Sequence, residues 1–207
     1  MTVSGDRTDN RRARILAVAR KHFGRFGFRR AVLDDMATEA GCAKGSLYLE
    51  FTSKQALYNA VLADVHAEVG KRFAVEVADI TSAAEWLRAS LRFTFATLER
   101  EPLLARLLAD DPEVPALRKY AAMDTVKAQA EAALTHFRGL LRRGIEAGEL
   151  RADLDLEVVP FVLAGLKFLH QHADLITAGM IDRNRLFDGI ADFALAALLA
   201  PATKESV

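Results

Sequence analysis

Apolar residues recur along this chain at the three- and four-residue spacing of an α-helix, and this spacing restricts the possible fold more than any other feature. Val and Ile are scattered, and no segment alternates apolar and polar residues as a half-buried strand does. Ala and Leu, which favour helices, dominate instead. The pattern therefore predicts an all-α protein.

The ends of the expected helices are marked by residues that favour helix termini. Ser53 suits the N-cap of a long helix, and Pro102 suits a first helical turn. Gly27 and Gly41 suit the position just after a last turn, and the polar residues 1–8 are expected to be disordered. The nine expected helices span residues 10–26, 33–40, 43–49, 53–77, 82–100 (beginning at 81 or 82), 102–109, 115–148, 155–177 and 182–199.

Positive charge is concentrated at one end of a chain whose formal net charge is zero. Residues 1–55 contain eleven Lys and Arg against six Asp and Glu, a balance of +5, which leaves −5 for residues 56–207. This asymmetry is typical of a phosphate-binding module attached to an acidic domain. A basic solvated face without a partner is the alternative interpretation.

Several functional classes find no support in the sequence. The N-terminus lacks an apolar signal core and no apolar run is long enough to cross a membrane, so we expect a cytoplasmic protein with no membrane partner. The single cysteine, Cys42, allows no internal disulfide, and we expect it to pack as a small apolar residue. His170 and His172 lie two residues apart and would face different sides of a helix, so no metal site is predicted. Neither a nucleophile motif nor a phosphate loop is present, so we expect no catalytic residues, no cofactor and no enzyme activity.

Residues 32–57 have the spacing of a helix-turn-helix, with two short helical segments joined by a turn at Gly41. In this motif the second helix enters the major groove of DNA. Gly45 lies early in that helix, where the absence of a side chain lets the backbone approach DNA. Lys44 and Ser46 beside it can reach base edges or phosphates.

Two further polar residues follow at helical spacing. Tyr48 places a hydroxyl one turn beyond the start of the second helix, although it could also only pack on its neighbours. Lys54 follows Ser53 at the start of the next helix, where backbone N–H groups favour a phosphate.

The motif resembles the DNA-binding domain of the TetR family of bacterial repressors. The positions that carry the resemblance are Arg14-Ile15-Leu16, Phe23, Gly27-Phe28, Asp35-Met36-Ala37, Ala40-Gly41, Gly45-Ser46-Leu47-Tyr48, Phe51 and Ser53-Lys54. The resemblance implies a repressor with an N-terminal DNA-binding domain over residues 1–55 and a helical regulatory, ligand-binding and dimerisation domain over 56–207. It also implies that a homodimer binds a palindromic double-stranded DNA operator and that an effector releases it. By the same resemblance the DNA contacts are Lys44, Gly45, Ser46, Tyr48 and Lys54.

The chain departs from the family pattern at several positions near DNA. Ala31 and Val32 replace hydroxyl residues, one of which commonly contacts phosphate in the family. Ala43 replaces a Ser or Thr at the start of the second helix, which removes a cap worth about 1 kcal/mol. Glu50 stands where the family often has His, and we expect its charge to repel phosphate.

Arg29 and Arg30 precede the first helix of the motif and could compensate for these losses. Asp34 and Asp35 favour the N-terminal dipole of that helix but add negative charge near DNA. We therefore predict that Arg29 or Arg30 anchors phosphate here.

The second domain is expected to supply both a ligand pocket and a dimer interface. The resemblance implies a cavity between its middle helices. Most of the large side chains there are also explained as ordinary core, but they suggest a mainly apolar lining, which suits a small apolar or aromatic effector. The predicted lining residues are Trp86, Phe93, Tyr120, Met123 and Phe137. The last two long helices are apolar around more of their circumference than one core-facing stripe needs, which indicates a second buried surface, most simply a dimer interface. A central position of both helices in a large monomer is the alternative interpretation. The predicted dimer residues are Phe161, Val162, Leu166, Leu169, Ile190, Phe193 and Leu198.

Two alternatives to a ligand-responsive repressor remain open on the sequence. The chain could regulate transcription in response to a protein partner rather than a small ligand. It could also be a helical scaffold or an enzyme that keeps a degenerate helix-turn-helix, an alternative that Ala31, Val32 and Glu50 support.

Overall fold

The computed structural model describes residues 3–108, 119–120 and 122–201, and they form two compact helical units. The first unit comprises residues 1–71 and 101–122, and the second comprises 72–100 and 123–207. Within the described residues, the β-type pairing consists of one antiparallel bridge, between Leu150 and Leu199. The prediction of an all-α protein is confirmed. The functional division at residue 55 stays a prediction, because the compact units divide the chain elsewhere.

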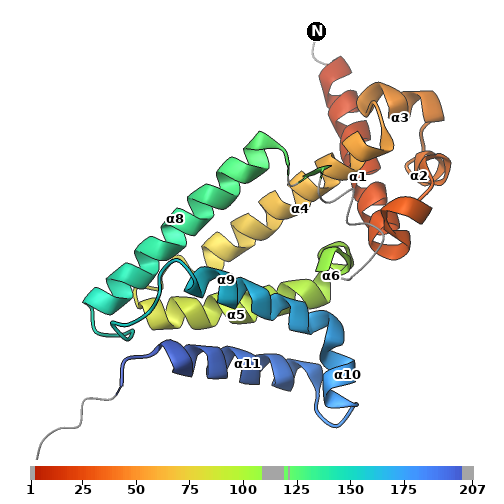
Figure 1. Ribbon diagram of the computed structural model, residues 1–207. Helices are drawn as coiled ribbons and strands as arrows, with labels where there is room; N and C mark the ends of the chain where they lie inside the picture. The colour runs from red at the N-terminus through yellow and green to blue at the C-terminus, as the bar shows by residue number, and fades with distance from the viewer. Residues whose placement is uncertain (1–2, 109–118, 121, 202–207) are drawn as a thin grey trace, which may run out of the picture. The chain divides into compact units, whose positions relative to one another are not determined.

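Apart from the first one, the helices of the first unit begin and end within one or two residues of the expected positions. Figure 1 shows their arrangement. They are α1 (Val3–Arg30), α2 (Leu33–Glu39), α3 (Lys44–Glu50), most of α4 (Lys54–Glu76) and α6 (Pro102–Leu108). The Oγ of Ser53 accepts a hydrogen bond from the N–H of Ala56 at 3.0 Å, which confirms the predicted cap of α4. α1 begins at Val3 although residues 1–8 were expected to be disordered, since extending an existing helix costs less than nucleating one. It kinks at Gly27 (φ 77°, ψ 170°), where the first helix was expected to end.

One apolar core joins the helices of the first unit. Phe23 of α1 packs edge-to-face on Tyr58 of α4, with ring centroids 4.9 Å apart. Met36 of α2 and Leu47 of α3 are fully buried as well. Because every helix of the motif contributes at least one buried side chain, the core fixes the orientation of α3 relative to α1 and α2.

α6 is attached to α1 by polar contacts. The guanidinium of Arg106 donates hydrogen bonds to the carbonyl oxygens of Gly24 at 3.2 Å and Arg25 at 3.1 Å. The guanidinium of Arg20 on α1 likewise donates to the buried carboxylate of Glu101 at 2.7 Å, just before α6. α6 therefore belongs to the same unit as the helix-turn-helix, although it lies far along the chain.

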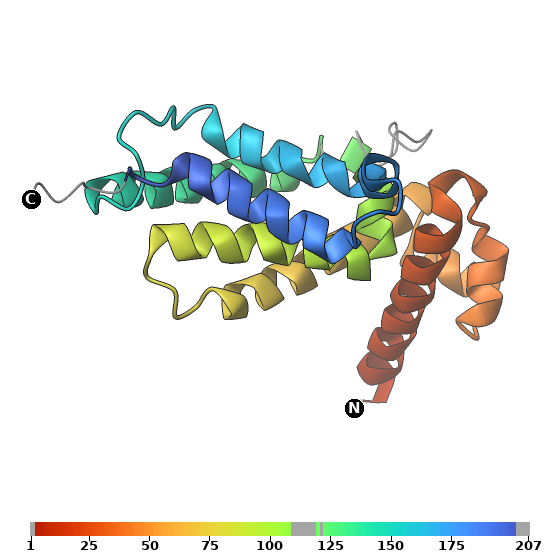
Figure 2. The same ribbon diagram turned by 90° about the horizontal axis from the view of Figure 1, so that it is seen from below.

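The second unit is a bundle in which α5 packs against both α8 and α11 (Figure 2). Its helices are α5 (Ala83–Arg100), α8 (Asp124–Glu146), α9 (Val159–Leu166), the 3-10 helix η1 (Lys167–His172), α10 (Ala173–Thr177) and α11 (Arg183–Leu198). The single helix expected over 115–148 is interrupted, because residues 119–120 are helical, residues 122–123 form a turn that leaves Met123 extended, and α8 begins at Asp124. Residues 109–118 and 121 lie outside the described residues. Its main core cluster is Ala83, Leu87, Leu140, Leu141, Leu150, Leu195 and Leu198.

The single helix expected over 155–177 is divided into α9, η1 and α10. Asp155 accepts hydrogen bonds from the N–H groups of Glu157 and Val158, so it caps this region as expected, but the α-helix begins only at Val159. At the other end, the carbonyl oxygen of His170 accepts a hydrogen bond from Arg183 at 3.2 Å. That side-chain donor competes with α-helical pairing, which favours the tighter 3-10 turn found here.

Candidate DNA-binding surface and ligand pocket

The turn between α2 and α3 depends on a glycine in the left-handed region. Gly41 has a φ of 64°, which side-chain-bearing residues rarely adopt. Its N–H donates to the carbonyl oxygen of Thr38 at 3.0 Å, and the N–H of Cys42 donates to that of Ala37 at 3.0 Å. This pair of hydrogen bonds is a Schellman motif, which ends α2 and reverses the chain into α3.

α3 exposes one face of small, polar and apolar residues. Leu47 points into the core, while Lys44, Gly45 and Tyr48 are exposed and Ser46 is half-buried. Leu49, which was not predicted from the sequence, is 83% exposed. Such a face can meet both phosphates and the apolar edges of bases.

Gly45 is not required by the packing of the protein itself. A methyl group at this position would meet no atom within 4 Å, and α3 continues through it as regular helix. The open space beside its backbone is thus available to an external partner.

Both lysines predicted to contact DNA have intramolecular partners. The Nζ of Lys44 lies 2.8 Å from an Asp34 carboxylate oxygen, and this hydrogen bond raises the pKa of Lys44. The Nζ of Lys54 donates to the carbonyl oxygen of Arg29 at 3.1 Å and lies 5.0 Å from the centre of the Phe28 ring. Each lysine must exchange or share these contacts before it can bind a phosphate.

The residues before α2 and α3 offer no side-chain caps. Val32 and Ala43 occupy the N-cap positions in extended conformation and form no capping hydrogen bond, as expected for this sequence. Ala31 is buried. Arg29 and Arg30 are exposed in the last turn of α1, so their cationic groups are accessible at this end of the motif.

The expected repulsion of DNA by Glu50 is corrected by the structure. The carboxylate of Glu50 accepts two hydrogen bonds from the guanidinium of Arg11, at 2.6 and 3.1 Å. Its side chain is only 11% exposed. Both hydrogen bonds end on Oε1 of Glu50, and this ion pair neutralises the charge within the protein. No local sequence signal could have identified Arg11 as the partner.

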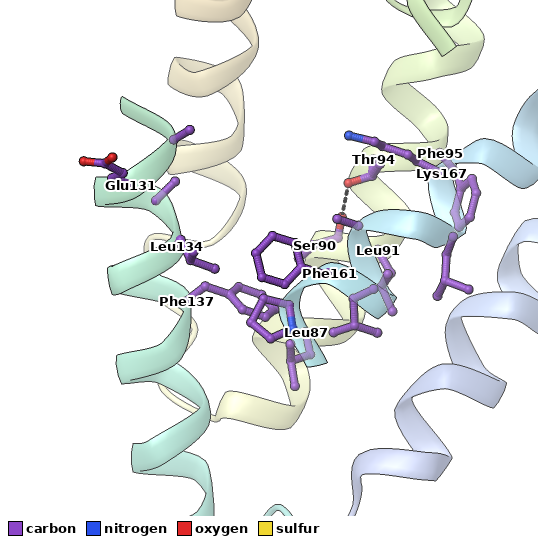
Figure 3. Close-up of a pocket in the computed structure, with 16 residues that line it drawn as sticks. Leu87, Ser90, Leu91, Thr94, Phe95, Glu131, Leu134, Phe137, Phe161 and Lys167 are labelled. Atoms are coloured by element: carbon purple, nitrogen blue, oxygen red, sulfur yellow. Dashed lines mark hydrogen bonds between the residues drawn. The ribbon is translucent and has the colours of Figure 1, made fainter. Parts of the chain in front are cut away.

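A cavity of about 660 Å³ lies in the second unit, between α5, α8 and the segment formed by α9 and η1. Figure 3 shows Leu87, Leu91 and Phe137 among its lining side chains. Polar groups are few, and the hydroxyl of Thr94 is already donated to the Ser90 carbonyl oxygen at 2.9 Å. The cavity has the size and apolar character of a small-molecule site.

Of the five residues predicted to line a ligand pocket, Phe137 lines this cavity. Trp86 packs behind it, with its ring 5.8 Å from that of Phe137. The ring of Phe93 instead lies 5.2 Å from that of Phe73, near the end of α4.

The other two predicted pocket residues lie elsewhere. Tyr120 is buried in the first unit, where its hydroxyl lies 2.8 Å from the Nδ1 of His66. Met123 is the exposed N-cap of α8. The size of a side chain therefore did not predict which residues line the cavity. On α5 the lining residues recur at helical spacing, as in the pairs Leu87 with Leu91 and Ser90 with Thr94.

The residues predicted to form a dimer interface divide into three groups. Phe161, Val162 and Phe193 are exposed, and Phe193 is 81% exposed. Leu166, Leu169 and Ile190 are half-buried. Leu198 is only 7% exposed because it belongs to the core cluster of its own unit, so it is removed from the predicted interface.

Other kinds of site find no geometric support in the described part of the chain. No three His, Cys, Asp or Glu residues are grouped there to hold a metal ion. The Nε2 of His170 lies 2.8 Å from the carboxylate of Glu99 instead. Among the same residues, no helix combines the length and apolarity needed to span a bilayer.

Family models match both parts of the chain. Residues 15–61 match the model described as bacterial regulatory proteins of the tetR family, and residues 84–185 match a tetracyclin repressor-like C-terminal domain. The HTH-type transcriptional repressor KstR2 of Mycolicibacterium smegmatis is 27% identical over 150 residues, 72% of this chain and 72% of that protein. The HTH-type transcriptional regulator YhgD of Bacillus subtilis is 23% identical over 167 residues, 76% of this chain and 80% of that protein.

Solved structures share the fold. The ketosteroid transcriptional regulator KstR2 of Mycobacterium tuberculosis superposes with a TM-score of 0.68 at 19% identity, covering 92% of this chain and 96% of that chain. The transcriptional regulator FadR of Bacillus subtilis, in complex with stearoyl-CoA, superposes with a TM-score of 0.69 at 19% identity, covering 89% of this chain and 98% of that chain.

Proposed function

From the premise that the chain belongs to the TetR family of bacterial regulatory proteins, and so is a DNA-binding transcriptional repressor and not an enzyme, we propose how it represses. A homodimer binds a palindromic operator in double-stranded DNA, and a small, mainly apolar effector releases it. The observation that carries the proposal is that α3 is fixed in the core on one side and exposes Lys44, Gly45 and Tyr48 on the other.

On this proposal α3 enters the major groove, while the C-terminal end of α1 and the N-terminal end of α4 bind the flanking phosphates. Gly45 allows the close approach, and Ser46 and Tyr48 supply hydroxyl groups. The cationic contacts are Arg29, Arg30, Lys44 and Lys54.

The proposed dimer forms through the exposed apolar residues of α9 and α11. Phe161, Val162 and Phe193 would otherwise present large apolar surfaces to water. Operator binding by such a dimer requires two copies of α3 about 34–36 Å apart, one turn of DNA. Phe193→Lys is expected to yield monomers in sedimentation velocity experiments, and an unchanged dimer would exclude this surface.

The proposed effector binds in the cavity of the second unit. The apolar lining supports this choice, as does the similarity to FadR, which was solved with stearoyl-CoA. Phe161 both lines the cavity and is exposed on α9, so an occupant would contact a residue of the proposed dimer surface. α4 would then carry the change, because its residues 54–71 belong to the first unit and 72–76 to the second.

A salt-dependent mobility shift tests the proposal. The full-length protein is titrated against the DNA upstream of its own gene and against an unrelated fragment of equal length. Arg29→Ala and Arg30→Ala should each weaken binding to all sequences and flatten the salt dependence by about one unit of slope. Failure to prefer the upstream fragment over the unrelated one at any salt concentration would contradict specific operator binding there, and unchanged slopes would exclude the arginine contacts.

A further inference from the structure

The cavity of the second unit is lined by one cationic side chain, for which the described residues supply no ion-pair partner. Two charged residues line the cavity, Glu131 of α8 and Lys167 at the start of η1. Among the described residues, Lys167 has no carboxylate within ion-pair distance. Its Nζ lies 5.7 Å from the centre of the Phe168 ring.

The two charged side chains have different orientations (Figure 3). In this view the Lys167 side chain extends in the direction of Thr94, whereas Glu131 points away from the other lining side chains. Glu131 therefore does not compensate the charge of Lys167. Lys167 is half-buried as a residue, and an ammonium group beside an apolar wall attracts an anion more strongly than the same group in bulk water does.

The rest of the cavity accommodates an apolar body. Leu87, Leu91, Leu134 and Phe137 line it, and its volume of about 660 Å³ falls within the range of small-molecule sites. We propose that the effector is an apolar monocarboxylate whose carboxylate pairs with Lys167. This inference rests on the proposed function, since it names the chemical class of the effector bound at that site.

Ligand binding can be followed without DNA, because the chain has a single tryptophan next to the cavity. The ring of Trp86 lies 5.8 Å from that of Phe137, which lines the cavity. The full-length protein is titrated with decanoic acid, decanol and decyltrimethylammonium, with fluorescence and calorimetry as readouts. Adamantanecarboxylic acid and adamantanemethanol repeat the comparison with a rigid apolar body.

The expected result is that at least one carboxylate binds about tenfold more tightly than its matching alcohol. Lys167→Met, which retains the apolar stem, should abolish this preference and leave the affinity for the alcohol unchanged. Lys167→Arg should preserve the preference, and Glu131→Gln is the matched control that should leave the ratio unaltered. Circular dichroism melts of each variant establish that it is folded.

Four outcomes would overturn the proposal: equal affinity for acid and alcohol in both pairs, a preference that survives Lys167→Met, tightest binding of the ammonium compound, or no binding of either acid. Operator binding is measured separately on the same preparation without any compound. A protein that prefers the acid yet does not bind its upstream DNA would refute the proposed function while the chemistry at Lys167 stands.

Discussion

The substitution Gly45→Ala is expected to change the stability of the protein and its DNA affinity in opposite directions. An added methyl group would meet no protein atom within 4 Å, so the substitution introduces no clash in the free protein. The residue lies within α3, where alanine is favoured over glycine by about 0.5–1 kcal/mol. The variant should therefore be more stable than the natural protein and nevertheless bind DNA less well.

The expected loss of affinity follows from the close approach of α3 to DNA. A methyl group between the backbone and the groove disturbs at least one contact, and base contacts are each worth about 1–3 kcal/mol. Two half-sites at the lower end of this range give about 2 kcal/mol, which is about a thirtyfold loss.

The assay combines urea unfolding with a mobility shift on the upstream DNA at fixed salt. Gly70→Ala is the matched control, because Gly70 also lies within a helix, α4, and its added methyl group would also meet no atom within 4 Å. It should raise the free energy of unfolding by a similar amount and leave the DNA affinity unchanged. Equal DNA affinities of the two variants would refute the close approach at Gly45.

Three further predictions concern the same unit. Asp34→Asn frees Lys44 from its carboxylate partner and removes a negative charge, so DNA affinity should rise by up to about fivefold. A lower DNA affinity of this variant in the mobility-shift assay would contradict the prediction. Gly41→Ala should destabilise the fold by about 1–2 kcal/mol because φ is 64° there, and an unchanged urea midpoint would refute the strain. The hydrogen bond from His22 lowers the pKa of Glu39 below its ordinary value of 4.5, so the stabilisation is fully present above about that pH and disappears as the pH falls through the lowered value. The stability difference between the natural protein and Glu39→Gln should accordingly vanish in acid, which unfolding curves across pH can check.

Local chemistry explains why much of the first unit was predictable. Ser53 caps α4 through an atom three residues away, and Gly41 ends α2 through hydrogen bonds that span five residues. Capping interactions of this kind involve residues that are close in the sequence, so the helix ends can be predicted from the sequence. The missing caps at Val32 and Ala43 were foreseeable for the same reason.

The charge at Glu50 could not be judged from its neighbours. Its partner Arg11 is 39 residues away, and only the tertiary fold of the first unit brings the two side chains together. The extent of the helices near η1 also depended on a distant group, the Arg183 side chain that bonds the carbonyl oxygen of His170.

The sequence by itself determined that this protein is all-α and where its helix-turn-helix lies, because helical periodicity and capping are local. The tertiary structure alone decided what each apolar face packs against. It placed Leu198 in the core, Tyr120 in the first unit and Lys167 at the cavity. The physical reason is that helical periodicity specifies only which face of a helix is removed from water. The core of the same unit, a second subunit or a ligand can each cover that face.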